Sequence, residues 1–172
     1  MLSKKMLKAL NYQINREIYS SYLYLSMSSY ANSIGLKGFA NWFNVQIQEE
    51  LAHAQIFYNY INDQNERAIM QTIEAPESKF KSPLDLFEKT LAHEKIVTGL
   101  INNLVSIARD EKDYATDNFL AWFVKEQVEE EANANDLIAK LKFIKDDGRG
   151  LLMLDTELAA RIFVAPAILQ AN

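Results

Sequence analysis

Apolar residues recur every three or four positions through most of this chain, which is the spacing of one face of an α-helix. The pattern predicts four long helices, at about residues 4–34, 39–62, 83–109 and 114–145. Gly148 and Gly150 break the chain, and a short apolar stretch at about 151–164 predicts a fifth helix. Residues 63–82 lack this periodicity. The sequence therefore predicts an all-α protein.

The connections between the predicted helices indicate how these helices are arranged. The first and third connections are short, so each joins two antiparallel neighbours. The second has about 20 residues and reaches about 65 Å when extended, whereas a helix of about 24 residues is about 36 Å long. It can therefore cross the bundle and make the second and third helices parallel. We expect a single domain over residues 1–172, with an up-down-down-up four-helix bundle at about 4–145 and a long crossover loop lying on its surface.

Residues typical of helix ends support these boundaries. Ser82 precedes Pro83, which favours Ser82 as the N-cap of the third helix and Pro83 as its first residue. Asp113 is in the position to cap the fourth helix, and Gly35 is suited to end the first.

Composition excludes several classes of function. The net charge is −5 with no basic block, so nucleic-acid binding is not indicated. No run of about 18 apolar residues predicts a membrane span, and the N-terminus lacks an apolar signal core, which favours the cytoplasm. The chain has no cysteine, which excludes disulfides, thiolate metal sites and iron–sulfur clusters.

Each of the four long helices carries an acidic residue on the stripe that it is expected to bury. These residues are Glu17, Glu50, Glu94 and Glu130, and His53 follows Glu50 by three positions. An ionised carboxylate removed from water costs several kcal/mol unless it is compensated. No lysine or arginine lies on the same stripes. Four carboxylates converging on one core therefore indicate cations, and a pair of metal ions is the simplest choice.

Glu50 and His53 lie about 60° apart around their helix, so both side chains can reach one ion. Trp42, Phe43 and Phe57 on the same face indicate that the pair points inward. Carboxylates with one imidazole suit iron or manganese. Two ions about 3.5–4 Å apart and bridged by a carboxylate such as Glu50 form a two-metal site.

Simpler interpretations of these acids stay open. One buried glutamate can be satisfied by a tyrosine, and Tyr24 is in a position to serve Glu17. Glu126, Glu129 and Glu130 share an arc of about 100°, and such a run is often a solvated face. Like charges this close repel one another unless a cation bridges them, and Glu49 is in a position to face the same cluster.

Over essentially its whole length the sequence resembles non-haem ferritins of the bacterial or archaeal type. The segments that carry the resemblance are Asn15–Tyr19, Gln48–Ala54, His93–Glu94 and Glu126–Glu131. The resemblance implies a ferritin-like fold and a role in iron storage and detoxification. It further implies oxidation of Fe(II) by dioxygen or peroxide and a ferric oxide mineral inside a hollow shell of twenty-four identical subunits.

The resemblance also implies a role for each candidate residue. One iron would be held by Glu17, Glu50 and His53. The other would be held by Glu50, Glu94 and Glu130, with Glu50 bridging the two. Gln127 would form a hydrogen bond near the site, and Tyr24 would assist oxidation. The residues that match a third iron site are Glu49, Glu126, Glu129 and Glu130.

Two departures from related families, and the orientation of one histidine, add to these expectations. Gln127 and Glu130 occupy the place where haem-binding bacterioferritins have a second Glu-x-x-His, and Leu51 replaces their haem-ligating methionine, so we expect no haem. Asp117 matches one acid of a hydrophilic three-fold channel, but Leu120 replaces the other, which leaves the route of iron open. His93 points about 100° away from Glu94, so we expect it at the surface or in an interface.

Three alternatives remain at this point. The first is a di-iron oxidase or peroxidase that acts on an organic substrate or in oxidative-stress defence. The second is a non-catalytic bundle whose acids serve solubility or assembly. The third is a miniature DNA-protecting cage, whose metal ligands lie at a subunit interface and which lacks the fifth helix.

Overall fold

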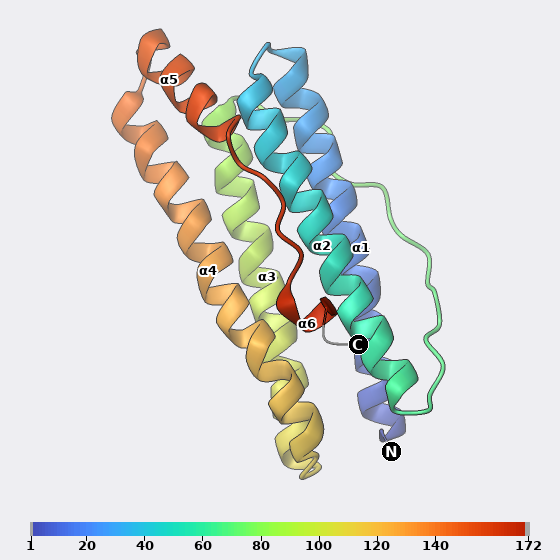
Figure 1. Cartoon of the computed structure of the whole chain (residues 1–172). Helices are drawn as coiled ribbons and strands as arrows, with labels where there is room; N and C mark the ends of the chain where they lie inside the picture. The colour runs from blue at the N-terminus through green and yellow to red at the C-terminus, as the bar shows by residue number, and fades with distance from the viewer. Residues whose placement is uncertain (1, 171–172) are drawn as a thin grey trace.

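In a computed structural model that describes residues 2–170, all regular secondary structure is helical. The helices are α1 (Lys4–Ser33), α2 (Lys37–Asp63), α3 (Pro83–Asp110), α4 (Tyr114–Ile144), α5 (Gly148–Leu158) and α6 (Ala167–Gln170). Figure 1 shows α1 to α4 as four long rods that lie side by side. The ends of the predicted domain, Met1, Ala171 and Asn172, lie outside the described residues. No helix of the described chain is long and apolar enough to cross a membrane.

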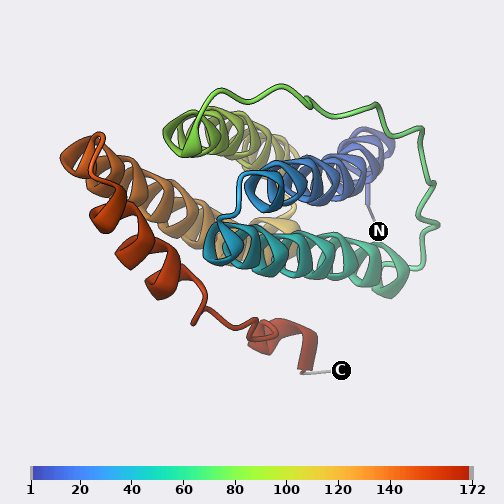
Figure 2. The same cartoon turned by 90° about the horizontal axis from the view of Figure 1, so that it is seen from above.

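The bundle has the predicted up-down-down-up order. Short turns join α1 to α2 and α3 to α4, and the chain between α2 and α3 returns along the full length of the bundle (Figure 1). Figure 2 shows this crossover outside α1 and α3, on the side away from α5. It is fixed to α1 because Asn15 Nδ2 donates to the Thr72 carbonyl at 3.0 Å and Arg16 pairs with Glu74 at 2.8 Å. The expected crossover loop on the bundle surface is therefore confirmed.

The helix ends match the residues that predicted them. Ser82 Oγ accepts a hydrogen bond from the backbone nitrogen of Asp85, and Pro83 begins α3. Asp113 caps α4 through the backbone nitrogen of Thr116. Gly35 follows α1 with φ of +83°, a conformation that suits glycine because it has no Cβ.

Two apolar clusters fill the bundle, one toward each end. The first includes Phe39, Phe43 and Phe87, and the second includes Leu10 and Phe57. Each long helix passes from one cluster to the other, and its candidate acid occupies the interval between them. In chain order these intervals are Ile14–Leu23, Phe43–Ile56, Phe87–Val97 and Phe123–Leu137. The four acids therefore share one level of the bundle.

The C-terminal region differs from its prediction. Gly148 and Gly150 do not interrupt the helical structure but lie inside α5, which begins at Gly148. The Asp147 side chain caps this helix by accepting a hydrogen bond from the Arg149 backbone nitrogen. This helix ends at Leu158, not near Val164, and the following chain is not helical until α6. Figures 1 and 2 show α5 and the chain after it on the α2 and α4 side of the bundle.

Candidate metal centre

Four carboxylates and one imidazole lie buried at the middle level of the bundle. The relative exposures of Glu17, Glu50, Glu94 and Glu130 are 1%, 2%, 1% and 5%, and that of His53 is 3%. Each long helix contributes one carboxylate because each places a glutamate where its inner face passes between the two apolar clusters. No lysine or arginine is among the buried residues of the described chain. This layer therefore concentrates acidic groups where water cannot screen them.

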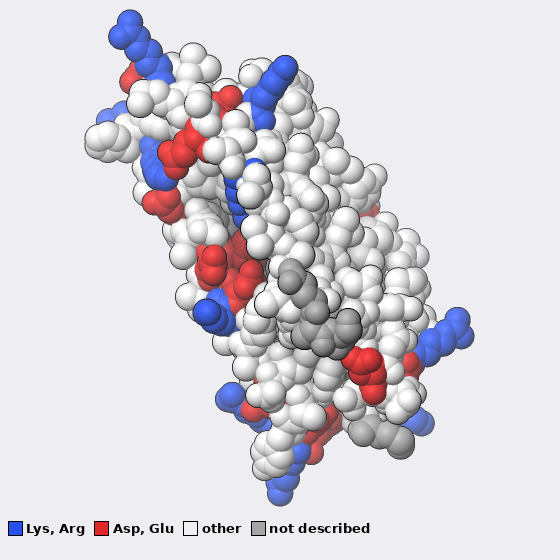
Figure 3. All heavy atoms as spheres, viewed as in Figure 1, with Lys and Arg blue, Asp and Glu red and all other residues white. Residues whose placement is uncertain are grey.

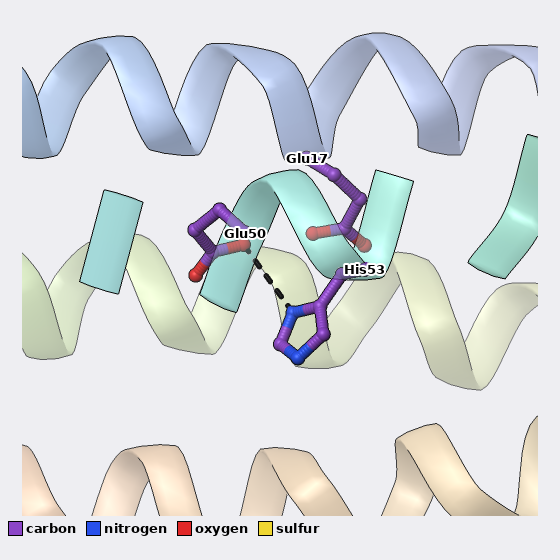
Figure 4. Close-up of side chains that lie close together, drawn as sticks. All are labelled: Glu17, Glu50 and His53. Carbon is purple, nitrogen blue, oxygen red and sulfur yellow. Dashed lines mark ion pairs between the residues drawn. The ribbon is translucent and has the colours of Figure 1, made fainter. Parts of the chain in front are cut away.

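Glu17, Glu50 and His53 form the tightest group. One ligand atom from each lies within 4.8 Å of the others, and no other set of three such side chains meets this limit among the described residues. His53 Nδ1 lies 3.5 Å from Glu50 Oε2. Figure 4 shows Glu17 reaching from α1 toward the two side chains that α2 supplies.

Two atoms of this group have no hydrogen-bond partner although they are buried. They are Glu17 Oε2 and His53 Nε2, whereas Glu17 Oε1 accepts from Gln13 Nε2 at 2.7 Å. A buried polar atom without a partner costs about 1–3 kcal/mol. A free carboxylate oxygen and an imidazole nitrogen beside a second carboxylate are a donor set that suits a divalent cation such as iron.

Glu94 and Glu130 face the same region but contact neighbouring donors. Tyr24 donates its hydroxyl hydrogen to Glu94 Oε1, and Gln127 Nε2 donates to Glu94 Oε2 at 3.1 Å. Gln46 Nε2 donates to Glu130 Oε2 at 3.0 Å. These bonds orient both carboxylates and leave lone pairs on each for a further partner.

The electrostatics of the layer favour either protons or metal cations. Burial, and then the charges of Glu94, Glu17 and Glu130, raise the pKa of Glu50 well above its ordinary value. Burial raises the pKa of Glu94 to about 7, although bonds from Tyr24 and Gln127 oppose this, and raises that of Glu130 to about 8. A site that holds protons at neutral pH for lack of other positive charge can exchange them for bound cations.

Three of the four acids predicted for a further iron site are less buried than the fourth, Glu130. Glu49 and Glu126 are partly buried and Glu129 is exposed. Their charges act on one another, because Glu126 raises the pKa of Glu49 after burial does, and Glu129 raises that of Glu126. Their ligand atoms do not form a group that meets the 4.8 Å limit.

His93 does not lie at the surface, one of the two places that the sequence left open for it, but is buried in the interface between α1 and α3. It is 7% exposed, and its Nε2 lies 2.7 Å from Ser20 Oγ of α1. Its ring lies between those of Tyr19 and Tyr24, at 5.8 and 6.1 Å. Burial, and then Arg16, lower its pKa to about 4. The reason is that Tyr19, Ser20 and Tyr24 of α1 pack against this side of α3.

Sequence reasoning missed three polar side chains that shape the centre. Gln13 and Gln46 are buried amides that donate to the carboxylates. Gln46 could have been found because it lies four residues before Glu50, on the same face of the helix. Arg161, which pairs with Glu49 at 2.7 Å, gave no such signal because it follows α5 in an irregular segment.

Comparison with known proteins gives a consistent result. The model of the ferritin-like domain matches residues 7–144. The chain is 45% identical over 163 residues to a bacterial non-heme ferritin of Staphylococcus epidermidis, covering 95% of this chain and 98% of the relative. It is 42% identical over 158 residues to a probable bacterial non-heme ferritin-like protein of Haemophilus influenzae, covering 92% and 96%. An open pore ferritin from Archaeoglobus fulgidus has a similar structure, with a TM-score of 0.93, 53% identity, and coverage of 94% of this chain and 100% of that one.

Proposed function

We propose, from the premise that this chain belongs to the ferritin family, that it oxidises Fe(II) at its buried acidic layer and stores the product as a ferric mineral. Storage of iron and ferroxidase activity are the functions of that family. The observation that carries the proposal for this chain is one carboxylate from each long helix, converging with His53 between two apolar clusters.

The first Fe(II) would bind Glu17, Glu50 and His53. Support comes from their mutual distances within 4.8 Å and from the free Glu17 Oε2 and His53 Nε2. Trp122 and Phe123 restrict the imidazole, with ring centres 5.5 and 5.9 Å from it. A ring that is already restricted loses little freedom when it binds a cation.

The second Fe(II) would bind Glu94 and Glu130, with Glu50 shared between the two ions. The charges of Glu94 and Glu130 are among the main causes of the raised pKa of Glu50, which supports their closeness to it. Binding of Fe(II) would release the protons that these carboxyls hold. A shared carboxylate keeps two ions close enough to react with one oxidant.

The chemistry balances with two Fe(II) per reaction. Each Fe(II) gives one electron, and dioxygen with two protons becomes hydrogen peroxide. With peroxide as oxidant, the same two electrons and two protons give two water molecules. Tyr24 and Gln127 would orient Glu94 during this reaction, because both donate to it.

Two further parts of the proposal concern the wider protein. Glu49, Glu126 and Glu129, with Glu130, would bind a third iron, supported by the mutual effects of their charges. We also propose a closed shell of twenty-four copies. Large apolar side chains stay exposed on a single chain, among them Phe143 at 91% and Met153 at 75%, and contact between copies would cover such residues.

Aerobic iron loading of the purified protein tests the proposal. Electron microscopy is expected to reveal hollow shells that contain an electron-dense core. Anaerobic titration is expected to give saturable binding of about two or three Fe(II) per subunit. Small oligomers without mineral would favour the di-iron oxidase, and absence of saturable binding would favour the non-catalytic bundle.

A further inference from the structure

The chain that follows α4 is fastened to α2 by specific contacts. Asp155 Oδ1 of α5 accepts a hydrogen bond from the Phe39 backbone nitrogen at 3.0 Å. A Cβ added to Gly38 would lie 1.6 Å from the carbonyl oxygen of Asp155, so only glycine allows this approach. Figures 1 and 2 show the segment continuing from there along α2. The attachment is therefore built into the sequence of α2.

Asn41 fixes the turn that leads out of α5. Its side-chain amide donates to the carbonyl oxygens of Leu158 at 3.1 Å, Ala159 at 3.3 Å and Arg161 at 2.9 Å. One side chain thus binds three carbonyl groups at and just after the C-terminal end of the helix, where the last carbonyls lack partners within the helix. Because one of these bonds is to the backbone of Arg161, the contacts also fix the place from which the Arg161 side chain extends.

Arg161 reaches from this segment to the edge of the acidic cluster. Its Nη2 lies 2.7 Å from Glu49 Oε2, and its Nη1 donates to the Trp42 carbonyl oxygen at 3.2 Å. Its guanidinium also lies over the indole of Trp42, 4.7 Å from the ring centre. The exposures of the Arg161 and Glu49 side chains are 23% and 22%, so water screens this pair less than it screens a pair at the surface.

Glu49 is also the member of the predicted third iron site that α2 supplies. The other members, Glu126, Glu129 and Glu130, come from α4. Figure 3 shows acidic side chains gathered in a hollow between α4 and the chain after α5, with basic atoms at its upper end. A guanidinium is charged at every relevant pH, so its charge at Glu49 is permanent while the segment is docked.

We propose that Arg161 is a tethered cation that competes with a metal ion for Glu49, so that docking of the segment after α5 weakens the third iron site. The inference rests on the proposed function of the acidic cluster. A divalent ion on Glu49 would lie within a few Å of the guanidinium, where like charges repel strongly at partial burial. The site would therefore fill readily only when Arg161 moves away.

Anaerobic calorimetric titration of the metal-free assembled protein tests this competition, with Fe(II) and with redox-inert Zn(II) as the probes. Arg161→Gln is expected to tighten the weakest binding step at least about tenfold and to leave the tighter steps unchanged. Arg161→Lys keeps the charge and is expected to keep most of the competition. Arg149→Gln, an equal loss of charge at an exposed position of α5, is the matched control and is expected to change nothing.

Two further variants exclude a general loosening of the C-terminal region as the cause. Gly38→Ala keeps Arg161 but cannot hold α5 in place, so it is expected to expose residues 159–166 to hydrogen exchange and to tighten the same step. In a Glu49→Gln background, Arg161→Gln is expected to have no effect, because the two side chains act through each other.

The proposed competition would be contradicted if the weakest step of metal binding had the same affinity in Arg161→Gln as in the original protein. It would also be contradicted if Arg149→Gln tightened that step as much as Arg161→Gln does. Gly38→Ala that undocks the segment without tightening the step would also overturn it. Failure of the proposed function looks different, because then Glu17→Gln and His53→Ala would leave the tighter binding steps intact.

Discussion

Tyr24 of α1 donates its hydroxyl hydrogen to Glu94 of α3, and both side chains are completely or almost completely buried. Gln127 of α4 donates to the other carboxylate oxygen. Three helices therefore meet at one glutamate. The Tyr24 ring is fixed between Phe43, 6.0 Å away and stacked, and the edge-on ring of His93. A tyrosine is thus held against a candidate metal ligand by contacts that do not depend on metal.

Tyr24→Phe should remove this donor while keeping the ring. Loss of the bond leaves one oxygen of Glu94 without its donor, which costs about 1–3 kcal/mol of unfolding free energy in the metal-free protein. Because the bond from Tyr24 lowers the pKa of Glu94, the variant should also raise that pKa above about 7. Urea unfolding measures the loss of stability. We also expect slower Fe(II) oxidation, which stopped-flow absorbance measures. Tyr22→Phe, at a residue that is 47% exposed, is the control.

Glu17→Gln and His53→Ala should each slow rapid Fe(II) oxidation by at least about tenfold, because each removes a proposed ligand of the first iron. The fold should persist, since circular dichroism depends on helices that neither side chain caps. The melting temperature of metal-free Glu17→Gln should not fall, because the substitution removes one of several like charges in the layer. Unchanged rates in stopped-flow absorbance would contradict the ligand assignment. Glu88→Gln, at an exposed acid of α3, serves as control.

The metal-free protein should be more stable in mild acid than in mild base. Glu94 and Glu130 have folded-state pKa values of about 7 and about 8, above their ordinary value of 4.5. From pH 4.5 to about pH 8 the folded protein binds more protons than the unfolded chain, so its stability falls as pH rises through this range. We expect a lower melting temperature at pH 8.5 than at pH 5.5. Zn(II) at saturation should reverse the order, because ligands must lose protons to bind metal. If the stability of the metal-free protein rose from pH 5.5 to pH 8.5, the raised pKa values of the buried acids would be contradicted.

His93→Gln should reveal the burial of this histidine through its pH dependence. The folded-state pKa of about 4 lies below the ordinary value of 6.5, so the neutral ring contributes stability above pH 6.5 that is lost as pH falls toward 4. The difference in unfolding free energy between the original protein and the variant should therefore shrink over that range. Urea titrations at pH 7 and pH 4.5 measure it. A constant difference would indicate that His93 does not become neutral on folding.

Much of the fold follows from periodicity and loop length. Helical spacing identified the inner faces of four helices, and residues 63–82 are long enough to cross the bundle. Because the stripes also carry Glu17, Glu50, Glu94 and Glu130, the same pattern predicted that four acids would be buried, and they are. Their roles as iron ligands stay a prediction that the titrations above address.

The burial of side chains beside the inner stripe of each helix depended on the neighbouring helices. His93 was expected at the surface or in an interface, and the sequence left the choice open because periodicity describes one helix alone. Its burial comes from Ser20 and the tyrosines of α1. The sequence by itself determined which residues are apolar on which stripe, and so the level at which the acids meet. Only the tertiary structure decided that Arg161 reaches Glu49 across 112 positions of sequence. The physical reason is that contacts of an irregular segment follow from the surface on which it docks, and no repeat in the chain encodes that surface.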